Sequence, residues 1–311
     1  MITPTPIKIT PPAWYRNAHP MVLRVGSGLI GAALYIAIVF INSDNGLPFA
    51  FGVALFSVLG ASELYRAVRR QHDGEPTDFL GYVGCIAFQL AAWTHSGARF
   101  KPFLPGLLVF LVISGLIAEL VKRRPKPITN VSTTLLGAVY VGWLFSYLTL
   151  LRGMPDLLHD HTQVLKPPIP GTTVGEWLVI YVTTSTWLSD VGALFIGRRF
   201  GRTPLAPEIS PNKTLEGSVG GLLASLILGG AFGVFLHIPP LHAFVLSLLC
   251  GIVGQVGDLS ESALKRDLGL RDFGDLLPGH GGILDRIDSL LFAAPMAYYY
   301  IAFFLVAPHA H

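Results

Sequence analysis

Apolar residues occur along this chain in long runs, and short polar segments separate one run from the next. A helix needs about 17–25 mostly apolar residues to cross the hydrocarbon core of a bilayer. Nine runs approach this length, and each predicts a membrane span. They cover residues 25–41, 47–64, 79–95, 103–121, 131–151, 177–196, 217–236, 241–258 and 289–306. The predicted fold is an all-α, polytopic integral membrane protein with about nine transmembrane helices.

The composition agrees with this prediction. The chain has 311 residues, of which 51% are hydrophobic and 13% are charged, with a mean hydropathy of +0.56. Soluble domains carry about 25% charged residues. No cleavage signature follows the first run, which favours a retained span over a signal peptide. Cys85 and Cys250 lie within apolar runs, which predicts neither a disulfide framework nor a metal site at these residues.

The basic residues predict the orientation. Eighteen of the 22 Lys and Arg residues lie in the N-terminal segment and in every second connection, and only four lie on the other side. Positive residues accumulate in cytoplasmic loops. We therefore expect the N-terminus in the cytoplasm and the C-terminus outside. The net charge of +3 follows from this rule and from attraction to anionic headgroups, so it predicts no nucleic-acid partner.

The acidic residues are distributed unevenly along the chain, which divides it into two parts. Residues 1–152 are predicted to form an N-terminal transmembrane scaffold of about five spans. Its acids Glu63 and Glu119, near span ends, are better explained as interfacial or paired groups than as catalysts. Residues 153–311 read as a C-terminal catalytic region, because ten of the 19 acids lie between Asp190 and Asp288. Most of these occupy two predicted cytoplasmic loops, 197–216 and 259–288.

The outer connection offers a rival cluster. Its acids and histidines could be drawn as a metal site, although a solvated, proline-rich loop is the favoured interpretation. These residues are Asp156, His159, Asp160 and His161.

The segment 258–289 combines acids, cations and glycines in an otherwise apolar chain. Charges beside lipid are costly and commonly functional. If a helix begins near Ile283, Asp285 and Asp288 share one face, which suits Mg²⁺, although capping alone could explain one of them. Arg286 offers a planar fork to a phosphate. The preceding Gly281-Gly282 pair allows backbone N–H groups to converge on an anion. Together these features predict a site for a phosphorylated substrate.

The other polar loop contributes similar chemistry. Asp190 lies in or at the end of an apolar span, which by default is a functional position. Lys213 and the arginines before it could bind phosphate or could simply follow the orientation rule. Thr214 and Glu216 have the spacing of a helix start, so part of this segment is capping.

The run from Ser262 to Asp288 resembles the signature of phosphatidate cytidylyltransferases (CDP-diacylglycerol synthases). It includes Lys265-Arg266, Asp272, Gly274, Leu277-Pro278, His280-Gly281-Gly282 and Asp285-Arg286-Ile287-Asp288. An upstream Ser-Pro-x-Lys-Thr-x-Glu-Gly and an Asp-x-x-Ala extend the resemblance over roughly 185–290. The family usually has Lys at Arg271, a second Lys at Asn212 and Tyr at Leu194.

The resemblance implies that CTP and phosphatidate react to give CDP-diacylglycerol and pyrophosphate in phospholipid biosynthesis. It implies metal ligands at Asp258, Asp285 and Asp288, and phosphate contacts from the cations and the glycine pair. The full set of implied catalytic and substrate-binding positions is Asp190, Ser210, Lys213, Thr214, Glu216, Asp258, Ser262, Lys265, Arg266, Arg271, Asp272, His280, Gly281, Gly282, Asp285, Arg286 and Asp288.

The resemblance also implies Mg²⁺ as cofactor, with two divalent ions expected and a monovalent cation as an alternative. It implies a homodimer in the bacterial cytoplasmic (inner) membrane, in contact with phospholipid, with the active site facing the cytoplasm. Two rivals remain. One is a CTP-dependent polyprenol kinase, and the other is a transporter with charged gating loops. A transporter should place its binding residues near mid-span and often has inverted repeats, and neither feature is evident here.

Overall fold

The computed structural model describes residues 20–41, 46–71, 74–94, 103–154, 167–274 and 281–306. Nearly all of them are helical. The elements are α2 (Pro20–Phe40), α3 (Leu47–Gln71), α4 (Asp78–Trp93), α5 (Phe103–Lys122), α6 (Pro127–Leu136), η3 (Gly137–Trp143), α7 (Leu144–Arg152), α9 (Val174–Phe200), β1 (Pro204–Ala206), β2 (Ser210–Thr214), α10 (Leu215–Ala224), η4 (Ser225–Gly229), α11 (Gly230–Phe235), α12 (Pro240–Asp267), α13 (Leu284–Ile301) and η5 (Ala302–Val306).

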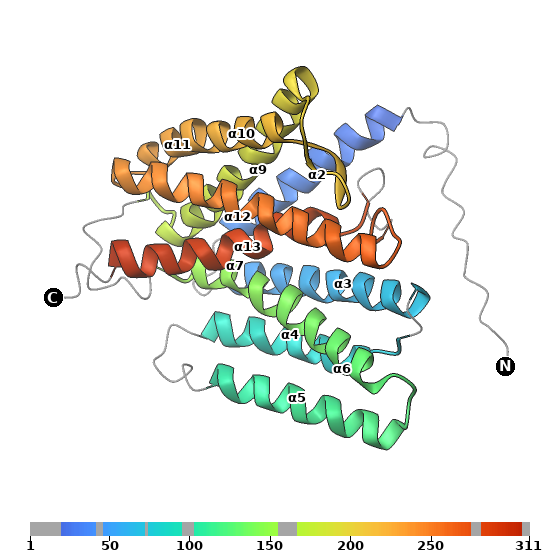
Figure 1. Cartoon of the computed structure of the whole chain (residues 1–311). Coiled ribbons are helices and arrows are strands. Elements are labelled where there is room, and N and C mark those ends of the chain that lie inside the picture. The colour runs from blue at the N-terminus through green and yellow to red at the C-terminus, as the bar shows by residue number, and fades with distance from the viewer. Residues whose placement is uncertain are drawn as a thin grey trace.

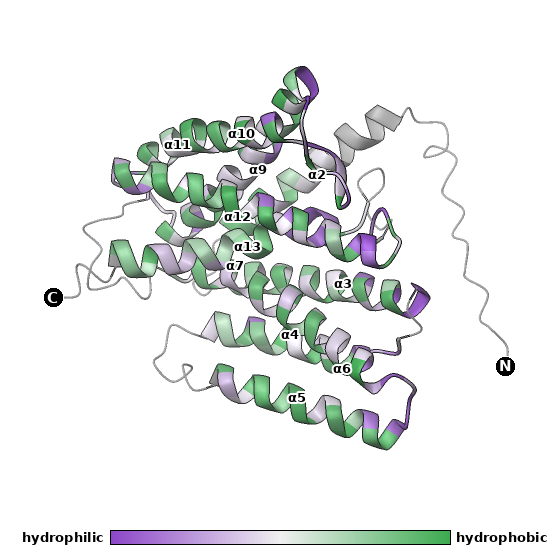
Figure 2. Ribbon diagram, viewed as in Figure 1, coloured by the Kyte–Doolittle hydropathy of each residue, from purple (hydrophilic) through white to green (hydrophobic). Residues whose placement is uncertain are grey.

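Most of the helices run side by side in a bundle, with α5 at one edge and α10–α11 at the other (Figure 1). The apolar residues of Figure 2 cover the lengths of the helices, and hydrophilic residues gather where α3, α5 and α12 end. The short antiparallel hairpin β1–β2 follows α9, with Pro204 opposite Thr214 and Ala206 opposite Ser210. The predicted helical, membrane-spanning fold is therefore confirmed in its class.

Every predicted span coincides with a helix, but the lengths differ. Among the described residues, seven helices are long and apolar enough to cross a membrane. The first predicted span coincides with α2 (Pro20–Phe40), whose apolar part includes Gly31–Phe40, and the third coincides with the shorter apolar helix Asp78–Trp93. The chain is thus an integral membrane protein by its helices, and the count of nine and the orientation of the termini remain predictions.

The span Pro127–Arg152 is the centre of the bundle and α5 is its edge. In the most apolar 18-residue stretch of each helix, 72% of the residues are buried in Pro127–Arg152 and 22% in α5. Side chains such as Phe110, Ile113 and Leu120 of α5 are exposed, as lipid contact requires. The central span contacts α3 and α13, so the scaffold reaches the C-terminal helices directly.

Helix α12 continues well past its apolar stretch. It ends at Asp267, so residues 259–267, which the sequence assigns to a loop, are helical. An i,i+4 ion pair between Glu261 and Lys265 supports this extension. A Cβ at Gly257 would lie 2.8 Å from the carbonyl oxygen of Asp288, so the glycine lets α12 and α13 approach closely. The extension keeps the polar end of α12 beside the start of α13.

Candidate active site

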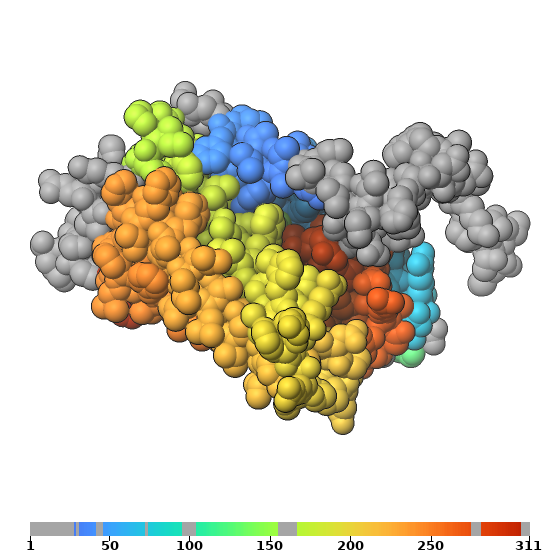
Figure 3. All heavy atoms as spheres, turned by 90° about the horizontal axis from the view of Figure 1, so that it is seen from above, coloured from blue at the N-terminus to red at the C-terminus, as the bar shows by residue number. Residues whose placement is uncertain are grey.

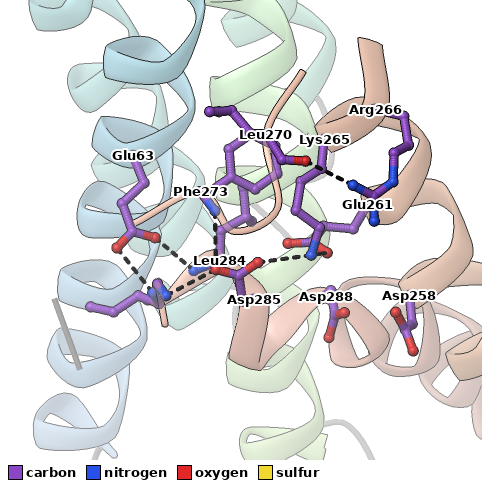
Figure 4. A network of polar contacts seen from close by, with 12 residues as sticks. Glu63, Asp258, Glu261, Lys265, Arg266, Leu270, Phe273, Leu284, Asp285 and Asp288 are labelled. Carbon is purple, nitrogen blue, oxygen red and sulfur yellow. Dashed lines mark hydrogen bonds and ion pairs between the residues drawn. The ribbon is translucent and has the colours of Figure 1, made fainter. Parts of the chain in front are cut away.

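The predicted site residues gather where α12 ends and α13 begins. Figure 3 shows this region between α9, the hairpin and the end of α12, with the first part of α13 visible among them. Figure 4 shows the side chains from close by, with Glu63 of α3 reaching in from the scaffold. The site is therefore built from elements that are more than 200 residues apart in sequence.

Three carboxylates form its centre. Ligand oxygens of Asp258, Glu261 and Asp288 lie within 4.8 Å of one another. Asp258 and Glu261 are three apart on α12 and so share a face, and Asp288 lies one turn into α13 (Figure 4). Glu261 is completely buried, and Asp288 is 9% exposed. Two of the three predicted metal ligands are thus together, with Glu261 as a third partner that the sequence prediction missed.

Asp285, the remaining predicted ligand, lies beside this group with its own partners. Its Oδ1 accepts a hydrogen bond from Lys265 Nζ at 2.8 Å, and Oδ2 accepts from the backbone N–H of Gly282 at 2.9 Å and of Phe273 at 3.2 Å. Lys265 also forms an ion pair with Glu261. Asp285 therefore ties the turn before α13 to the end of α12, and its role as a metal ligand stays a prediction.

Lys213 joins the hairpin to the carboxylates. Its Nζ lies 2.6 Å from Asp258 Oδ2. Arg266 holds the same hairpin, because its Nε donates to the carbonyl of Ile209 at 2.9 Å and its Nη1 donates to the carbonyl of Leu270. The predicted cation Arg266 thus uses two of its donors on main chain. Lys213 and Lys265 are the two cations that contact the carboxylates directly among the described residues.

Thr214 and Glu216 have local roles in the structure. Thr214 caps α10 by accepting from the N–H of Gly217 at 3.1 Å, as the sequence alternative suggested. Glu216 accepts hydrogen bonds from the backbone N–H groups of Arg202 and Thr203 and from the Thr203 hydroxyl. These two residues shape the hairpin. Ser210 begins β2 of the same hairpin.

The other predicted residues lie on α9, on α12 and in the segments just before and at the start of α13. Asp190 on α9 is close enough to Asp288, Asp258 and Lys213 to interact with their charges. Ser262 is buried on α12. At the rim, Arg271, Asp272 and Arg286 are exposed. Gly281 has φ +82°, a left-handed conformation that favours glycine. His280 lies outside the described residues, as do the acids and histidines of the rival outer cluster.

Tyr140 is a further residue that sequence reasoning missed. Its ring packs edge-on against Phe292, one turn beyond Asp288, and its hydroxyl lies in the field of the three central carboxylates. The residue is 8% exposed, and its hydroxyl has no hydrogen-bond partner among the described residues. An aromatic residue in an apolar run carries no local signal of such a position.

The arrangement fits a hard divalent cation. Four carboxylates (Asp258, Glu261, Asp285 and Asp288) meet two lysines, so the group would carry a surplus of negative charge if all four were ionised. Buried charges need compensation. Neither oxygen of Glu261 accepts a hydrogen bond from any described group apart from its contact with Lys265. Oxygen ligands of this kind are what Mg²⁺ prefers. The described residues therefore contain an acidic group that could bind a metal ion.

The described residues thus form a multi-span helical protein with carboxylates and lysines together at one end of the bundle. Comparison with known sequences specifies the class. The pattern of the cytidylyltransferase family matches residues 22–304. This chain belongs to that family, and the resemblance in its motifs is thereby confirmed.

Three relatives match this chain along nearly their whole length. A phosphatidate cytidylyltransferase of Synechocystis is 33% identical over 296 residues, which cover 91% of this chain and 97% of the relative. The protein of the same name from Bacillus subtilis is 30% identical, over 91% and 98% of the two chains. That of Staphylococcus haemolyticus is 45% identical, over 89% and 97%.

Proposed function

We propose that this protein is a membrane nucleotidyltransferase that converts CTP and phosphatidate into CDP-diacylglycerol and pyrophosphate. Membership of the family and the names of its full-length relatives support the reaction. The structural observation that supports this reaction is the group formed by Asp258, Glu261 and Asp288 beside two lysines. With a divalent cation bound, such a group would suit two polyanionic substrates that must meet.

The reaction needs no protein nucleophile. An oxygen of the phosphatidate phosphate, already an anion, forms a bond to the α-phosphorus of CTP. The bond from that phosphorus to the bridging oxygen of the β-phosphate breaks, and pyrophosphate leaves with the electron pair. The enzyme must therefore hold two anions in line and stabilise the departing charge. A serine or cysteine nucleophile is not required.

We propose that Asp258, Glu261 and Asp288 would hold Mg²⁺, with Asp285 as the further predicted ligand and two divalent ions expected in all. Bound there, the metal would supply positive charge for the substrate phosphates and for the pyrophosphate. Lys265 is held between Glu261 and Asp285, so it presents its charge at a fixed place. Lys213 reaches the centre from the hairpin and is free of helix constraints, which suits a group that moves onto a phosphate.

The remaining positions are proposed as follows. Asp190, Ser262 and the exposed rim bind or orient the substrates, and the backbone of Gly281 and Gly282 approaches a phosphate. The C-terminal half, residues 153–311, supplies the site, and residues 1–152 serve mainly as scaffold. The rim cations are Arg271 and Arg286, beside Asp272.

We further propose that the protein acts as a homodimer in the bacterial inner membrane, with the active site facing the cytoplasm, where CTP is available. The surplus of Lys and Arg in alternate connections supports this orientation. A cysteine at Arg202, in the exposed turn after α9, should be protected from an impermeant thiol reagent in intact cells, and a cysteine at exposed Ile169 should react. Both native cysteines are buried, which keeps the background low. The opposite labelling pattern would reverse the orientation.

Purified protein with labelled CTP, phosphatidate and Mg²⁺ tests the function directly. We expect a labelled liponucleotide and stoichiometric pyrophosphate. With CTP labelled in the γ-phosphate and a polyprenol in place of phosphatidate, we expect no labelled lipid. Transfer of the γ-phosphate to the polyprenol would instead identify a kinase, and the absence of any product with either acceptor would contradict an enzymatic role.

A further inference from the structure

Glu63 makes an unusual contact across the molecule. It lies in α3, in the scaffold half, and its side chain is 3% exposed. Its Oε1 accepts a hydrogen bond from the N–H of Ile283 at 3.0 Å, and its Oε2 accepts one from the N–H of Leu284 at 2.9 Å (Figure 4). The two partners are 220 and 221 positions away along the chain. A carboxylate of the first half thus binds the start of α13.

The start of α13 needs such a partner. The first N–H groups of a helix have no acceptor within the helix, and a polar side chain at the N-cap normally supplies one. Here the N-cap residue is Ile283, whose side chain cannot accept a hydrogen bond. Glu63 supplies both acceptors from outside, and its negative charge is favourable at a helix N-terminus. It therefore acts as an N-cap donated by another helix.

The surroundings are shaped around this carboxylate. A Cβ at Gly274 would lie 2.5 Å from Glu63 Oε1, and a Cβ at Gly282 would lie 2.6 Å from Oε2. Both glycines therefore allow main chain to lie against the carboxylate. No ion pair of Glu63 occurs among the described residues, so main-chain N–H groups are its polar partners there.

The turn that Glu63 caps carries the site. Asp285 is the second residue of α13, and Asp288 lies one turn further on. Asp288 completes the carboxylate group only if the start of α13 keeps its position relative to α12, which holds Asp258 and Glu261. A shift of this start would separate Asp288 from its two partners.

We propose that Glu63 is a positioning residue for the metal site: by capping α13 from the scaffold, it holds Asp288 against Asp258 and Glu261. This inference rests on the proposed function in that these carboxylates bind Mg²⁺. It assigns a role in the site to the N-terminal half, which otherwise serves as scaffold. In this proposal Glu63 acts through the main chain of α13 and is not itself a metal ligand.

The test compares Glu63→Gln with Glu119→Gln. Glu119 is also buried on an apolar helix, 7% exposed, and accepts a hydrogen bond from Asn130 Nδ2 at 2.8 Å, so it is a matched buried carboxylate away from α13. A glutamine at 63 keeps one acceptor but turns an NH₂ group toward a backbone N–H. We expect amide exchange in residues 283–288 to be faster in Glu63→Gln and unchanged in Glu119→Gln.

The second readout is metal binding without substrate. Mn²⁺ binding to detergent-solubilised full-length protein, followed by its paramagnetic resonance signal, should weaken about ten-fold in Glu63→Gln and stay at the wild-type value in Glu119→Gln. Glu63→Asp keeps the charge but is one methylene shorter, so its Mn²⁺ affinity should lie between those of the wild type and Glu63→Gln. It replaces Glu63→Gln in the test if that variant does not fold. Wild-type Mn²⁺ affinity in a folded Glu63 variant would overturn the inference. Because this measurement uses no CTP or lipid, failure of the proposed reaction would appear separately, as a wild-type protein without cytidylyl transfer.

Discussion

Two buried ionic groups lie at opposite ends of the bundle. At one end Arg152, the last residue of α7, pairs with Glu176 of α9 at 2.7 Å, and both are nearly inaccessible. At the other end Lys265 is shared by Glu261 and Asp285, beside Asp258 and Asp288. Helix α3 connects the two, since Gly46 before it packs on Arg152 and Glu63 lies about 25 Å further along, at about 1.5 Å per residue.

The difference between them is charge balance. Arg152 and Glu176 are one cation and one anion, and Glu176 also completes a capping box with Thr173 at the start of α9. Every charge there has a partner, so the pair is explained by stability and architecture. The α12–α13 end has four carboxylates and two lysines in contact with them. Both ends are buried, so the excess of carboxylates over lysines is what distinguishes the α12–α13 end from the Arg152–Glu176 end.

Removal of a central carboxylate should have the largest effect. In Asp258→Asn and Asp288→Asn proteins we expect turnover to fall about 1,000-fold, because a metal ligand is lost where charge develops. Both residues are replaced by side chains of similar size, so folding should persist. EDTA should abolish wild-type turnover and Mg²⁺ should restore it. Folded variants with wild-type rates and an unchanged Mg²⁺ requirement would contradict the metal site.

Asp285→Asn separates two roles of one carboxylate. We expect turnover to fall about 100-fold, with part of the loss recovered at high Mg²⁺, as the predicted role of Asp285 as a ligand requires. The titration of activity with Mg²⁺ in both proteins measures this recovery. A loss that Mg²⁺ does not change would restrict Asp285 to holding Lys265 and the turn before α13.

Arg152→Met should affect stability and leave chemistry intact. Removing one partner of a buried pair costs about 3 kcal/mol, because Glu176 stays buried without its cation. We expect a lower unfolding temperature but wild-type turnover and Mg²⁺ requirement per folded molecule. The double variant Arg152→Met/Glu176→Gln should regain part of the stability, since glutamine keeps the capping-box acceptor. A changed Mg²⁺ requirement would show that the two ends are coupled.

The smallest effect is expected at the rim. Arg271 is exposed. Arg271→Lys should keep turnover within about two-fold, because exposed charges interact weakly and need no fixed shape. Arg271→Gln should raise the KM for CTP by removing the charge. Equal KM values in the two variants would show that charge at this position does not matter.

Sequence reasoning located the helices and two of the three central carboxylates, because hydropathy and short spacings are local properties. Glu261 was missed, although it lies three residues after Asp258 and four before Lys265, the spacing of a common helix face. That signal was present in the sequence. It was hidden because the segment was read as a loop.

Glu63 and Tyr140 are a different case. Their positions depend on contacts of α3 and the central span with α13, more than 100 residues away along the chain. No local pattern contains that information. The interpretation of Glu63 as an interfacial or paired group was reasonable for a span-end acid, and the structure replaces it with main-chain capping of α13.

The uninterrupted course of α12 has a consequence for depth. The apolar residues of α12 and the charged residues that follow them form one continuous helix. Asp258 therefore lies at a fixed distance along the helix axis, about 14 Å from the last residue, Asp267, at about 1.5 Å per residue. The part of α12 before Asp258, residues 240–257, is about 27 Å long at about 1.5 Å per residue, close to the hydrocarbon thickness of about 30 Å. We therefore expect the carboxylates to lie at the boundary between the hydrocarbon core and the headgroups, which depth-dependent quenching of a probe near Asp258 would check. A site at that depth can receive its lipid substrate by lateral diffusion, so the substrate need not leave the membrane.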